Sequence, residues 1–387
     1  MFRSESNPQP KFLILYASYG DGHLQVARAI KSSLEELGNH RTVMVDLMAE
    51  SHPWLNEVTR RFYLKSYTHM PSLYGWMYDF TKPMKHDSWF GGLLHSFGRE
   101  KIRRILQSEQ PDIIVHTFPG FALPEHKRRK GSYPPSFTVI TDFDLHGRWV
   151  HPGIDRYYVA TDDLKRELTQ LGIPNHAVQV TGIPLKRGFR AAAATGELYE
   201  RYNLNPNQPI ILIMAGAHGV MPDVAQICSG LLNDANVQVA LVCGRNLLMK
   251  EGIEKQFQDH PCFSRLHVYG FIEPIHELMA ISDCLITKPG GVTLSEGITA
   301  GLPLFIYRPV PGQEKQNARY LASKGAAVIA DEVNELTDQI LKLVHDPLRL
   351  TTSKLSTKQL QTSQTAADSI VLDILSIIRI MEKASTL

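Results

Sequence analysis

The sequence predicts an α/β protein made of two doubly wound parallel-sheet halves. Short apolar runs rich in Ile, Val and Leu alternate with helical segments along the 387 residues, and several of these runs end directly in a glycine turn. Strands that alternate with helices pair in parallel, because each helix carries the chain back to the end of the sheet where the strand began. A chain of this length also accommodates two or three domains.

The first half contains four runs that read as buried strands and one clear amphipathic helix. The helix lies between the first two strands, with Ala27, Ile30, Leu34 and Leu37 on one apolar stripe and Gly38 as its stop signal. We place this domain at residues 1–190. Its predicted strands are Phe12–Ala17, Thr42–Val45, Asp112–His116 and Phe137–Ile140.

The second half repeats the pattern with shorter connections over residues 209–365. Residues 191–208 mix Arg, Ala, Asn and Pro without a clear strand, and we interpret them as a linker. Residues 366–387 form a tail with Ile370, Ile374 and Ile377 at helical spacing, and we expect this helix to return to the first domain. The predicted strands of this half are Ile210–Met214, Val237–Val242, Leu266–Val268, Leu285–Thr287, Leu304–Tyr307 and Ala327–Ile329.

Composition limits the classes of function. A hydrophobic fraction of 43% fits a globular chain with a substantial core, and a net charge of +2 gives no overall attraction to nucleic acid. The four cysteines form no Cys-x-x-Cys pair, which argues against a zinc site and fits a reducing cytosol. We see no secretory signal and no apolar run of about 18 residues. We therefore expect a cytoplasmic protein that meets a membrane only at its surface.

Residues 52–104 depart from the strand–helix alternation. Between Trp54 and Phe97 lie eleven aromatic residues, and from Trp54 to Arg104 there are nine Lys or Arg against four Asp or Glu. An apolar, aromatic face with basic flanks is typical of a helix in a membrane interface, although a helical excursion packed on its own domain fits the composition as well. The residues that we assign here to acceptor or membrane contact are Trp54, Arg60, Arg61, Phe62, Tyr63, Trp76 and Trp89.

The densest group of chemistry-bearing residues runs from Cys284 to Asn317. It contains two strand–turn–helix units, whose turns open at the carboxyl edge of a parallel sheet, where such sheets bind ligands. The first turn, Gly290-Gly291-Val292-Thr293, offers helix N–H groups and little side-chain bulk, which suits a diphosphate. Fixed donors aimed at a leaving diphosphate can replace a metal ion. Glu296, one turn further on, offers a carboxylate to the diol of a ribose.

The second turn adds an amide and a carboxylate. Gln313 and Glu314 follow Pro311-Gly312 and open the next helix. An acidic residue there complements the helix dipole, but the pair is also suited to gripping sugar hydroxyls. Together the two turns favour a nucleotide-sugar as ligand. Four further candidates follow other strands of this half: Gly216 and His218 for the diphosphate, and Phe271 and Ile272 for the base.

The first half has its own glycine turn, Tyr19-Gly20-Asp21-Gly22-His23, after its first strand. His23 lies at the start of the next helix, and a helix N-terminus disfavours imidazolium, so the ring stays neutral and able to accept a proton. We therefore predict that His23 is the general base that deprotonates the hydroxyl of the molecule receiving the sugar (the acceptor). We count Gly22 among the residues that contact the nucleotide-sugar (the donor).

A second polar segment, Thr141-Asp142-Phe143-Asp144, follows the last predicted strand of the first half. Its Asp-x-Asp spacing binds a divalent metal in one class of glycosyltransferases, but we favour a polar loop at a strand end and assign no metal ligand. Asp142 is a candidate assistant to His23. His146 and Trp149 are candidates for the acceptor side.

These segments, taken in order, resemble the family of diacylglycerol glycosyltransferases that includes the plant monogalactosyldiacylglycerol synthases, and are most similar to its bacterial processive β-glucosyltransferases. A more distant similarity, mainly in the second half, is to the bacterial glucosaminyltransferase that makes lipid II. Plant members have Gly-Gly-Gly-His where this chain has Gly20-Asp21-Gly22-His23, so Asp21 has no assigned role. The resemblance covers about residues 11–330 and is carried by Tyr19–His23, His116–Pro119, Thr141–Phe143 with His146 and Trp149, Thr181–Pro184, Met214–Gly219, Thr287–Gly291 and Pro311–Lys315.

The resemblance implies a GT-B fold, with two Rossmann-like domains and an active site in the cleft between them. It implies an inverting, metal-independent transfer of glucose from UDP-glucose to diacylglycerol, and processively to glucosyl-diacylglycerol, giving membrane glycolipids that are candidate anchors for lipoteichoic acid. It places the nucleotide in the second domain with Glu296 on the ribose, and the catalytic base at His23. Residues 52–104 then meet an anionic membrane surface on the cytoplasmic face. No cofactor is expected.

Several alternatives stay open at the level of sequence. Glucose and galactose differ in the configuration of one hydroxyl, and Gln313 and Glu314 suit either sugar. The acceptor is alternatively a soluble or polyprenyl molecule. A UDP-sugar epimerase of similar fold needs no acceptor, and a UDP-sugar sensor needs no catalysis.

Overall fold

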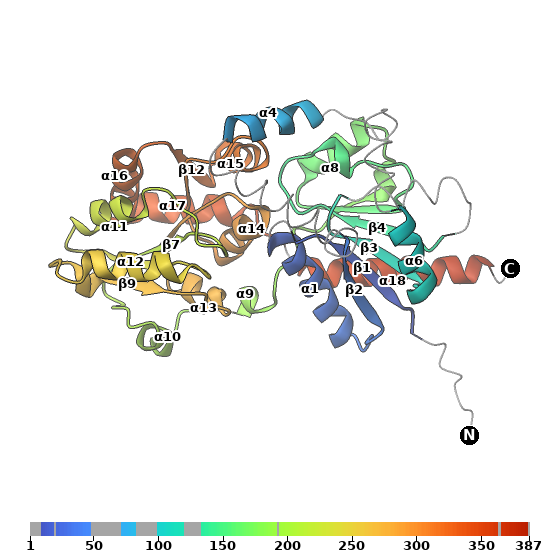
Figure 1. The fold of residues 1–387 in the computed structure, drawn as a ribbon, viewed down its shortest axis with the longest axis horizontal. Coiled ribbons are helices and arrows are strands. Elements are labelled where there is room, and N and C mark those ends of the chain that lie inside the picture. The colour runs from blue at the N-terminus through green and yellow to red at the C-terminus, as the bar shows by residue number, and fades with distance from the viewer. Residues whose placement is uncertain are drawn as a thin grey trace, which may run out of the picture. The chain divides into compact units, whose positions relative to one another are not determined.

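The computed structural model describes residues 9–18, 21–47, 71–82, 99–119, 133–191, 193–362 and 365–385. The chain divides into two compact units (Figure 1). The first unit is Met1–Lys186 with Thr362–Leu387, and the second is Arg187–Gln361. Each unit has a six-stranded sheet of its own in which every pairing is parallel, so the predicted α/β class with two Rossmann-like domains is confirmed.

The first unit has the strand order β2-β1-β3-β4-β5-β6. Its first strand is fully apolar and buried along most of its length, as expected for a central strand covered on both faces. The elements of this unit are β1 Phe12–Tyr16, α1 Asp21–Glu36, β2 Thr42–Asp46, α4 Pro71–Thr81, α6 Arg99–Glu109, β3 Ile113–His116, β4 Ser136–Val139, β5 Arg156–Val159, α8 Asp162–Gln170, β6 Val178–Val180 and α18 Ala366–Ser385.

The sequence prediction missed the last two strands of the first sheet, β5 and β6. The β5 strand reads Arg-Tyr-Tyr-Val, and β6 has only three residues, so neither forms an apolar run of ordinary length. Burial of Tyr157 and Tyr158 makes β5 a core strand despite its polar atoms. Their hydroxyls find partners, because Tyr157 donates to the carbonyl of His151 at 2.8 Å and Tyr158 donates to Asp373 at 2.8 Å.

The C-terminal helix α18 belongs to the first unit (Figure 1). Polar contacts at two places join it to the rest of that unit. Asp373 accepts hydrogen bonds from Arg156 and Tyr158 of β5. Ser33 of α1 donates to Asp368 at 2.6 Å. Along the same stretch the helix buries Ile370, Val371 and Ile374. The tail Thr362–Leu387 is thus part of the first unit.

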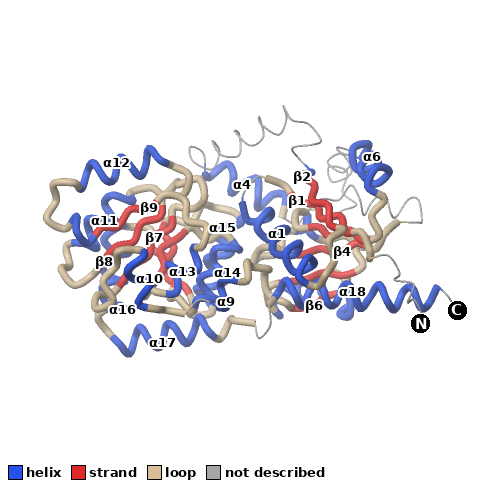
Figure 2. Tube along the Cα trace, turned by 90° about the horizontal axis from the view of Figure 1, so that it is seen from below, coloured by secondary structure: helices blue, strands red, loops and turns tan. Residues whose placement is uncertain are grey.

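The second unit has the strand order β12-β11-β10-β7-β8-β9, and its strands form one layer with helices on either side (Figure 2). The turns described below follow five of its strands, β7 to β11. The elements are α9 Gly188–Ala191, α10 Gly196–Arg201, β7 Ile210–Met214, α11 Val224–Leu232, β8 Gln238–Val242, α12 Leu247–Phe257, β9 Leu266–Tyr269, α13 Ile275–Ala280, β10 Cys284–Thr287, α14 Gly291–Ala300, β11 Leu304–Tyr307, α15 Gln313–Ser323, β12 Ala327–Ala330, α16 Val333–Val344 and α17 Pro347–Lys358.

The segment interpreted as a linker, 191–208, lies within the second unit. Its helix α10 carries the buried Leu198, and Tyr202 just beyond the helix is buried as well. The hydroxyl of Tyr202 donates to Glu277 at 2.9 Å, and Tyr269 donates to the carbonyl of Tyr202 at 2.6 Å. The segment is therefore packed against α13 and β9. Among the helices that the structure describes, none has the length and apolarity needed to span a bilayer.

Candidate functional site

The second sheet gathers the predicted donor turns at one edge. β10 pairs with β7 on one side and with β11 on the other. All three strands run in parallel, so the turns that follow them, starting at Ala215, Lys288 and Arg308, open side by side at the carboxyl edge.

The turn after β10 has room for a ligand. Gly290 caps α14, and a Cβ built at Gly290 meets no atom within 4 Å, so the space beside it is open. Deeper in the helix, a Cβ at Gly297 would lie only 2.5 Å from Leu304, which means that α14 packs directly on the sheet. The N-terminal N–H groups of α14 are thereby held rigidly at the sheet edge, in the arrangement that binds phosphate groups.

The turns after β10 and β11 are joined by side chains. Asn317 is fully buried and its amide donates to the carbonyl of Pro289 at 3.1 Å. Lys288 lies close enough to Glu314 for the carboxylate to oppose the lowering of its pKa, which burial causes. Gly312 adopts a φ of 98°, a conformation that favours glycine, just before α15 begins. The two turns therefore form one structural unit, which the sequence analysis had only placed at the same edge.

The turns after β7 and β8 interlock through glycines. Gly219 and Gly244 both have positive φ, and a Cβ on either would lie within 2.4 Å of a neighbouring carbonyl oxygen. Arg245 donates its backbone N–H to Ala217 at 3.0 Å, and its guanidinium lies 4.6 Å from the ring centroid of Phe271. This stack places a cation and an exposed aromatic ring, 48% accessible, at the end of β9.

The other predicted donor residues of the second unit occupy the same edge with different exposure. Gly216 has a φ of 77° and open space beside it, as at Gly290. His218 is exposed, whereas Gly291 and Val292 are buried in the first turn of α14. Those that are partly buried, and so accessible to a ligand, are Ile272, Thr293, Glu296, Gln313 and Glu314.

In the first unit, His23 lies in the first turn of α1, beside Gly22. Its ring Nδ1 lies 2.6 Å from the backbone oxygen of Thr117, after β3, and 3.2 Å from the hydroxyl oxygen of Thr141, after β4. The ring also makes an edge contact with Phe118 at 5.2 Å between centroids, and Trp149 lies at 6.2 Å. Three strand ends of the first sheet therefore converge on one imidazole.

Burial lowers the pKa of His23 to about 4, although the hydrogen bond to Thr117 acts in the opposite direction. The ring is therefore neutral at ordinary pH. The position of His23 at a helix N-terminus predicts a neutral ring, and the cause that lowers its pKa in the structure is desolvation by burial.

The loop that contains Asp142 also holds α4 in place. Asp144 accepts from Lys82 at 2.7 Å and from the Tyr78 hydroxyl at 3.0 Å. His146 accepts from the backbone of Arg148 at 3.1 Å, and burial is the main reason that its pKa falls to about 4. Asp144 thus ties the loop to α4, which accounts for one carboxylate of the Asp-x-Asp pair structurally.

The predicted acceptor residues are only partly described. Asp142, His146 and Trp149 are buried, at 5%, 7% and 4% exposure. Trp76 on α4 is 62% exposed and stacks on Phe80 at 5.4 Å between centroids. The residues of the aromatic and basic prediction that lie outside the described residues are Trp54, Arg60, Arg61, Phe62, Tyr63 and Trp89.

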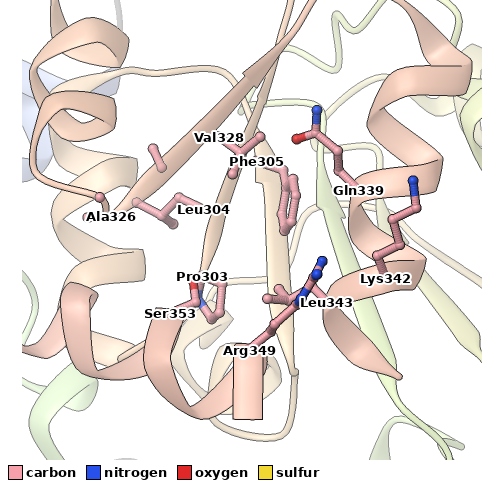
Figure 3. Close-up of a pocket in the computed structure, with 12 residues that line it drawn as sticks. Pro303, Leu304, Phe305, Ala326, Val328, Gln339, Lys342, Leu343, Arg349 and Ser353 are labelled. Atoms are coloured by element: carbon pink, nitrogen blue, oxygen red, sulfur yellow. The ribbon is translucent and has the colours of Figure 1, made fainter. Parts of the chain in front are cut away.

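A separate pocket of about 190 Å³ lies at the opposite edge of the second sheet (Figure 3). Leu304 and Ala327, which begin β11 and β12, line it together with Phe305, Lys342 and Arg349. The pocket lies at the amino ends of the strands, whereas the turns described above lie at their carboxyl ends. It is therefore separate from the predicted donor site. Among the described residues, no group of three or more His, Cys, Asp or Glu side chains is placed to hold a metal ion.

Comparison with known proteins decides the family. Residues 23–185 match the monogalactosyldiacylglycerol (MGDG) synthase family, and residues 210–370 match the glycosyltransferase family 28 C-terminal domain. The processive diacylglycerol β-glucosyltransferases of Bacillus licheniformis and Bacillus subtilis are each 39% identical over 369 residues, covering 95% of this chain and 95% and 96% of theirs. The chain belongs to this glucosyltransferase family. The resemblance inferred from the sequence is confirmed.

Solved structures place the glucosyltransferase chain in the GT-B fold. MurG of Acinetobacter baumannii has a TM-score of 0.62 at 16% identity, covering 95% of this chain and 100% of that one. The S. aureus MnaA–UDP structure also has a TM-score of 0.62, at 14% identity, covering 96% and 97%. At these identities the likeness concerns the fold alone.

Sequence reasoning gave no role to four residues that the glucosyltransferase structure brings to the candidate site. Thr117 and Thr141 contact His23, Lys288 lies beside Glu314, and Arg245 stacks on Phe271. All except Arg245 come within two residues of the end of a buried strand. That position was the available signal, because such residues reach the carboxyl edge of a parallel sheet.

Proposed function

We propose that this chain transfers glucose from UDP-glucose to 1,2-diacylglycerol, and then to the glucosyl-diacylglycerol product, with inversion and without a metal ion. The observation that carries the proposal is its 39% identity, over 95% of the chain, to relatives named processive diacylglycerol β-glucosyltransferases. The two joined donor turns and the neutral His23 supply groups suited to each substrate.

The donor turns would hold UDP-glucose as follows. The diphosphate lies at the open space beside Gly290 and Gly216, where α14 presents its N–H groups. Glu296 accepts hydrogen bonds from the ribose hydroxyls. Gln313 and Glu314 bind the glucose hydroxyls. The exposed ring of Phe271, stacked on Arg245, lies beside the uracil together with Ile272.

The reaction needs a proton acceptor and a stabilised leaving group. His23 removes the proton from the lipid hydroxyl as its oxygen bonds to the anomeric carbon, and the bond from that carbon to the diphosphate oxygen breaks. The departing UDP gains negative charge, which the N-terminus of α14 stabilises. A preorganised donor of this kind is typically worth roughly 10²-fold in rate. Single displacement inverts the anomeric centre, giving a β-linked product.

Membrane binding in this proposal is peripheral and on the cytoplasmic face. Trp76 and Phe80 form an exposed aromatic pair on α4, with exposures of 62% and 58%. The same helix is tied to the loop carrying Asp144 and His146, so a lipid that meets this pair lies near the described acceptor side of the first unit. Aromatic side chains are favoured at the interface between lipid and water.

Mass spectrometry of the lipid products tests the function. The full chain is incubated with diacylglycerol vesicles and an equimolar mixture of UDP-glucose and UDP-galactose that carry different isotopes. We expect mono- and diglucosyl-diacylglycerol with the glucose label, and the same yield in EDTA. Predominant transfer of the galactose label would replace the proposed donor. Loss of activity in EDTA would remove the metal-free mechanism.

The same incubation separates the alternatives. Epimerised sugar formed in the absence of lipid would indicate an epimerase, and UDP-glucose binding without any lipid product would indicate a sensor. The His23→Ala variant should retain UDP binding and lose most turnover. Near-normal turnover in that variant would remove His23 from the mechanism while leaving the transfer reaction intact.

A further inference from the structure

Thr117 holds His23 at two points. The ring Nδ1 of His23 lies 2.6 Å from the backbone oxygen of Thr117, and the Thr117 hydroxyl donates to the backbone oxygen of His23 at 3.1 Å. The same hydroxyl lies 3.3 Å from the carbonyl of Leu15. Thr117 is fully buried, so this contact joins the end of β1, the end of β3 and the first turn of α1 away from water.

A backbone carbonyl accepts hydrogen bonds and never donates them, so the short contact at 2.6 Å requires a proton on Nδ1. A neutral imidazole has one ring proton, and Nε2 is therefore the bare nitrogen. The alternative tautomer would set the Nδ1 lone pair against the carbonyl oxygen. The Thr141 hydroxyl oxygen, 3.2 Å from Nδ1, is a second acceptor for the same proton.

We propose that Thr117 and Thr141 are the positioning residues of the reaction, which fix His23 as the Nδ1–H tautomer and so present Nε2 as the base. The inference rests on the proposed function, because it concerns the residue that deprotonates the acceptor. Neither threonine touches substrate in this proposal. Both act through the imidazole, as a carboxylate does in a Ser-His-Asp triad.

The difference from a carboxylate partner is one of charge. A carbonyl and a hydroxyl orient the ring without a full negative charge that would stabilise imidazolium. The ring then remains neutral on both sides of neutral pH, in agreement with its lowered pKa. The contacts of Thr117 and Thr141 with the ring therefore orient the base and leave its basicity low.

The first test uses paired variants at Thr141. Thr141→Val removes the hydroxyl at nearly constant volume, and Thr141→Ser retains it. We expect kcat to fall about threefold to tenfold in Thr141→Val, the effect of losing one hydrogen bond, with the KM for UDP-glucose unchanged. Thr141→Ser should recover most of the rate. Equal rates in wild type and Thr141→Val, with His23→Ala inactive, would overturn the role of Thr141 and leave the proposed base in place.

The second test observes the tautomer directly. Long-range proton–nitrogen NMR spectra of the full chain labelled with ¹⁵N-histidine distinguish a protonated from a bare ring nitrogen, and the His23→Ala spectrum identifies the His23 signals. We expect Nδ1 protonated and Nε2 bare in wild type, and a larger share of the other tautomer in Thr141→Val, which removes the second acceptor of the Nδ1 proton. Thr141→Ser, which keeps the hydroxyl, should keep the wild-type pattern. A wild-type ring protonated at Nε2 would overturn the inference, whatever the activity of the variants.

Discussion

Asn317 on α15 donates its side-chain amide to the carbonyl of Pro289, in the turn that precedes α14, over 3.1 Å. The amide is fully buried, and 28 residues separate the two in sequence. This bond joins the turn proposed to hold the diphosphate to the helix that begins with Gln313 and Glu314. The position of the turn at Pro289 and Gly290 therefore depends on Asn317, a residue that need not touch the ligand.

Replacing this amide should loosen the donor turns. In Asn317→Leu the Pro289 carbonyl loses its buried donor, which costs about 1–3 kcal/mol. We expect a lower free energy of unfolding in urea and a UDP dissociation constant raised roughly tenfold by calorimetry. The matched control is Asn334→Leu, at an exposed position in the first turn of α16. Wild-type UDP affinity in Asn317→Leu would show that the bond does not position the turn.

Glu296 should act on donor binding rather than on chemistry. Glu296→Gln keeps the shape of the side chain but removes a charged acceptor from the proposed ribose contact. Hydrogen bonds to a charged group are worth about 1.5–3 kcal/mol, so we expect the KM for UDP-glucose to rise at least about tenfold with little change in kcat. Glu251→Gln, on the exposed face of α12, is the control. A fall in kcat at constant KM would contradict the ribose assignment.

The rate of transfer should change little with pH around neutrality. His23 acts in its neutral form, and its pKa in the folded protein is lowered to about 4, chiefly by burial. The neutral fraction is therefore nearly complete above about pH 5.5 and falls only as the pH approaches about 4. We expect the acidic limb of kcat/KM to lie well below the ordinary histidine pKa of about 6.5, measured where circular dichroism shows the chain folded. A limb centred near 6.5 would exclude the buried ring as the base.

His116 should make the protein sensitive to acid. It is buried at the end of β3, and neither ring nitrogen has a hydrogen-bond partner among the residues that the structure describes. Burial, with a smaller effect of His151, lowers its pKa to about 4. Above about pH 6.5 both the folded and unfolded forms are neutral, and the stabilisation is fully present. As the pH falls from about 6.5 to 4, only the unfolded form takes up a proton, so stability is lost.

The variant His116→Leu removes this proton uptake. Between pH 7.5 and 5 we expect the free energy of unfolding in urea to fall by about 2 kcal/mol less in the variant than in wild type. His23 and His146 also have lowered pKa values and keep some acid sensitivity in both proteins. Equal losses in wild type and variant would show that His116 takes no part.

The aromatic pair on α4 should contribute to vesicle binding. Trp76 and Phe80 are exposed, so the double alanine variant should keep the wild-type melting temperature. Burying one large apolar side chain in lipid is worth about 1.5–3 kcal/mol, which predicts a loss of affinity of at least about tenfold in co-sedimentation with anionic vesicles. Phe263→Ala, an exposed aromatic of the second unit, is the control. Undiminished binding of the double variant would place the membrane contact elsewhere.

The sequence predicted the second sheet better than the first, for a physical reason. Five of the six strands of the second sheet contain an apolar run of three or more residues, such as Ile210–Met214 and Leu304–Tyr307, whose bounds agree with β7 and β11. In the first sheet, β5 is stabilised by tyrosine hydroxyls with specific partners across the fold, which no local pattern records. The periodicity of a sequence reports burial along one strand but not the partners of its polar atoms.

In the candidate site, too, the sequence predicted the positions of the turns but not the partners of their polar atoms. Glycine turns after strands located His23 and the turn at Gly290, because the position of a turn follows from the order of strands. The contacts that orient these groups, from Thr117, Thr141 and Asn317, join residues 28 to 118 positions apart. Such pairs are fixed by the three-dimensional packing of the sheet, so they were out of reach of motif reasoning on one sequence.

The return of α18 to the first unit has a consequence for the order in which the chain folds. The first unit leaves off at Lys186 and resumes at Thr362, with the whole second unit between them. During synthesis, Arg187–Gln361 is continuous and can fold as soon as it emerges from the ribosome. The first unit must wait for its second segment, Thr362–Leu387, which supplies Ile370 and Asp373 to its core and to β5. On a translating ribosome the unit that begins first is thus completed after the second unit, and its apolar faces stay available to chaperones or lipid until α18 has emerged.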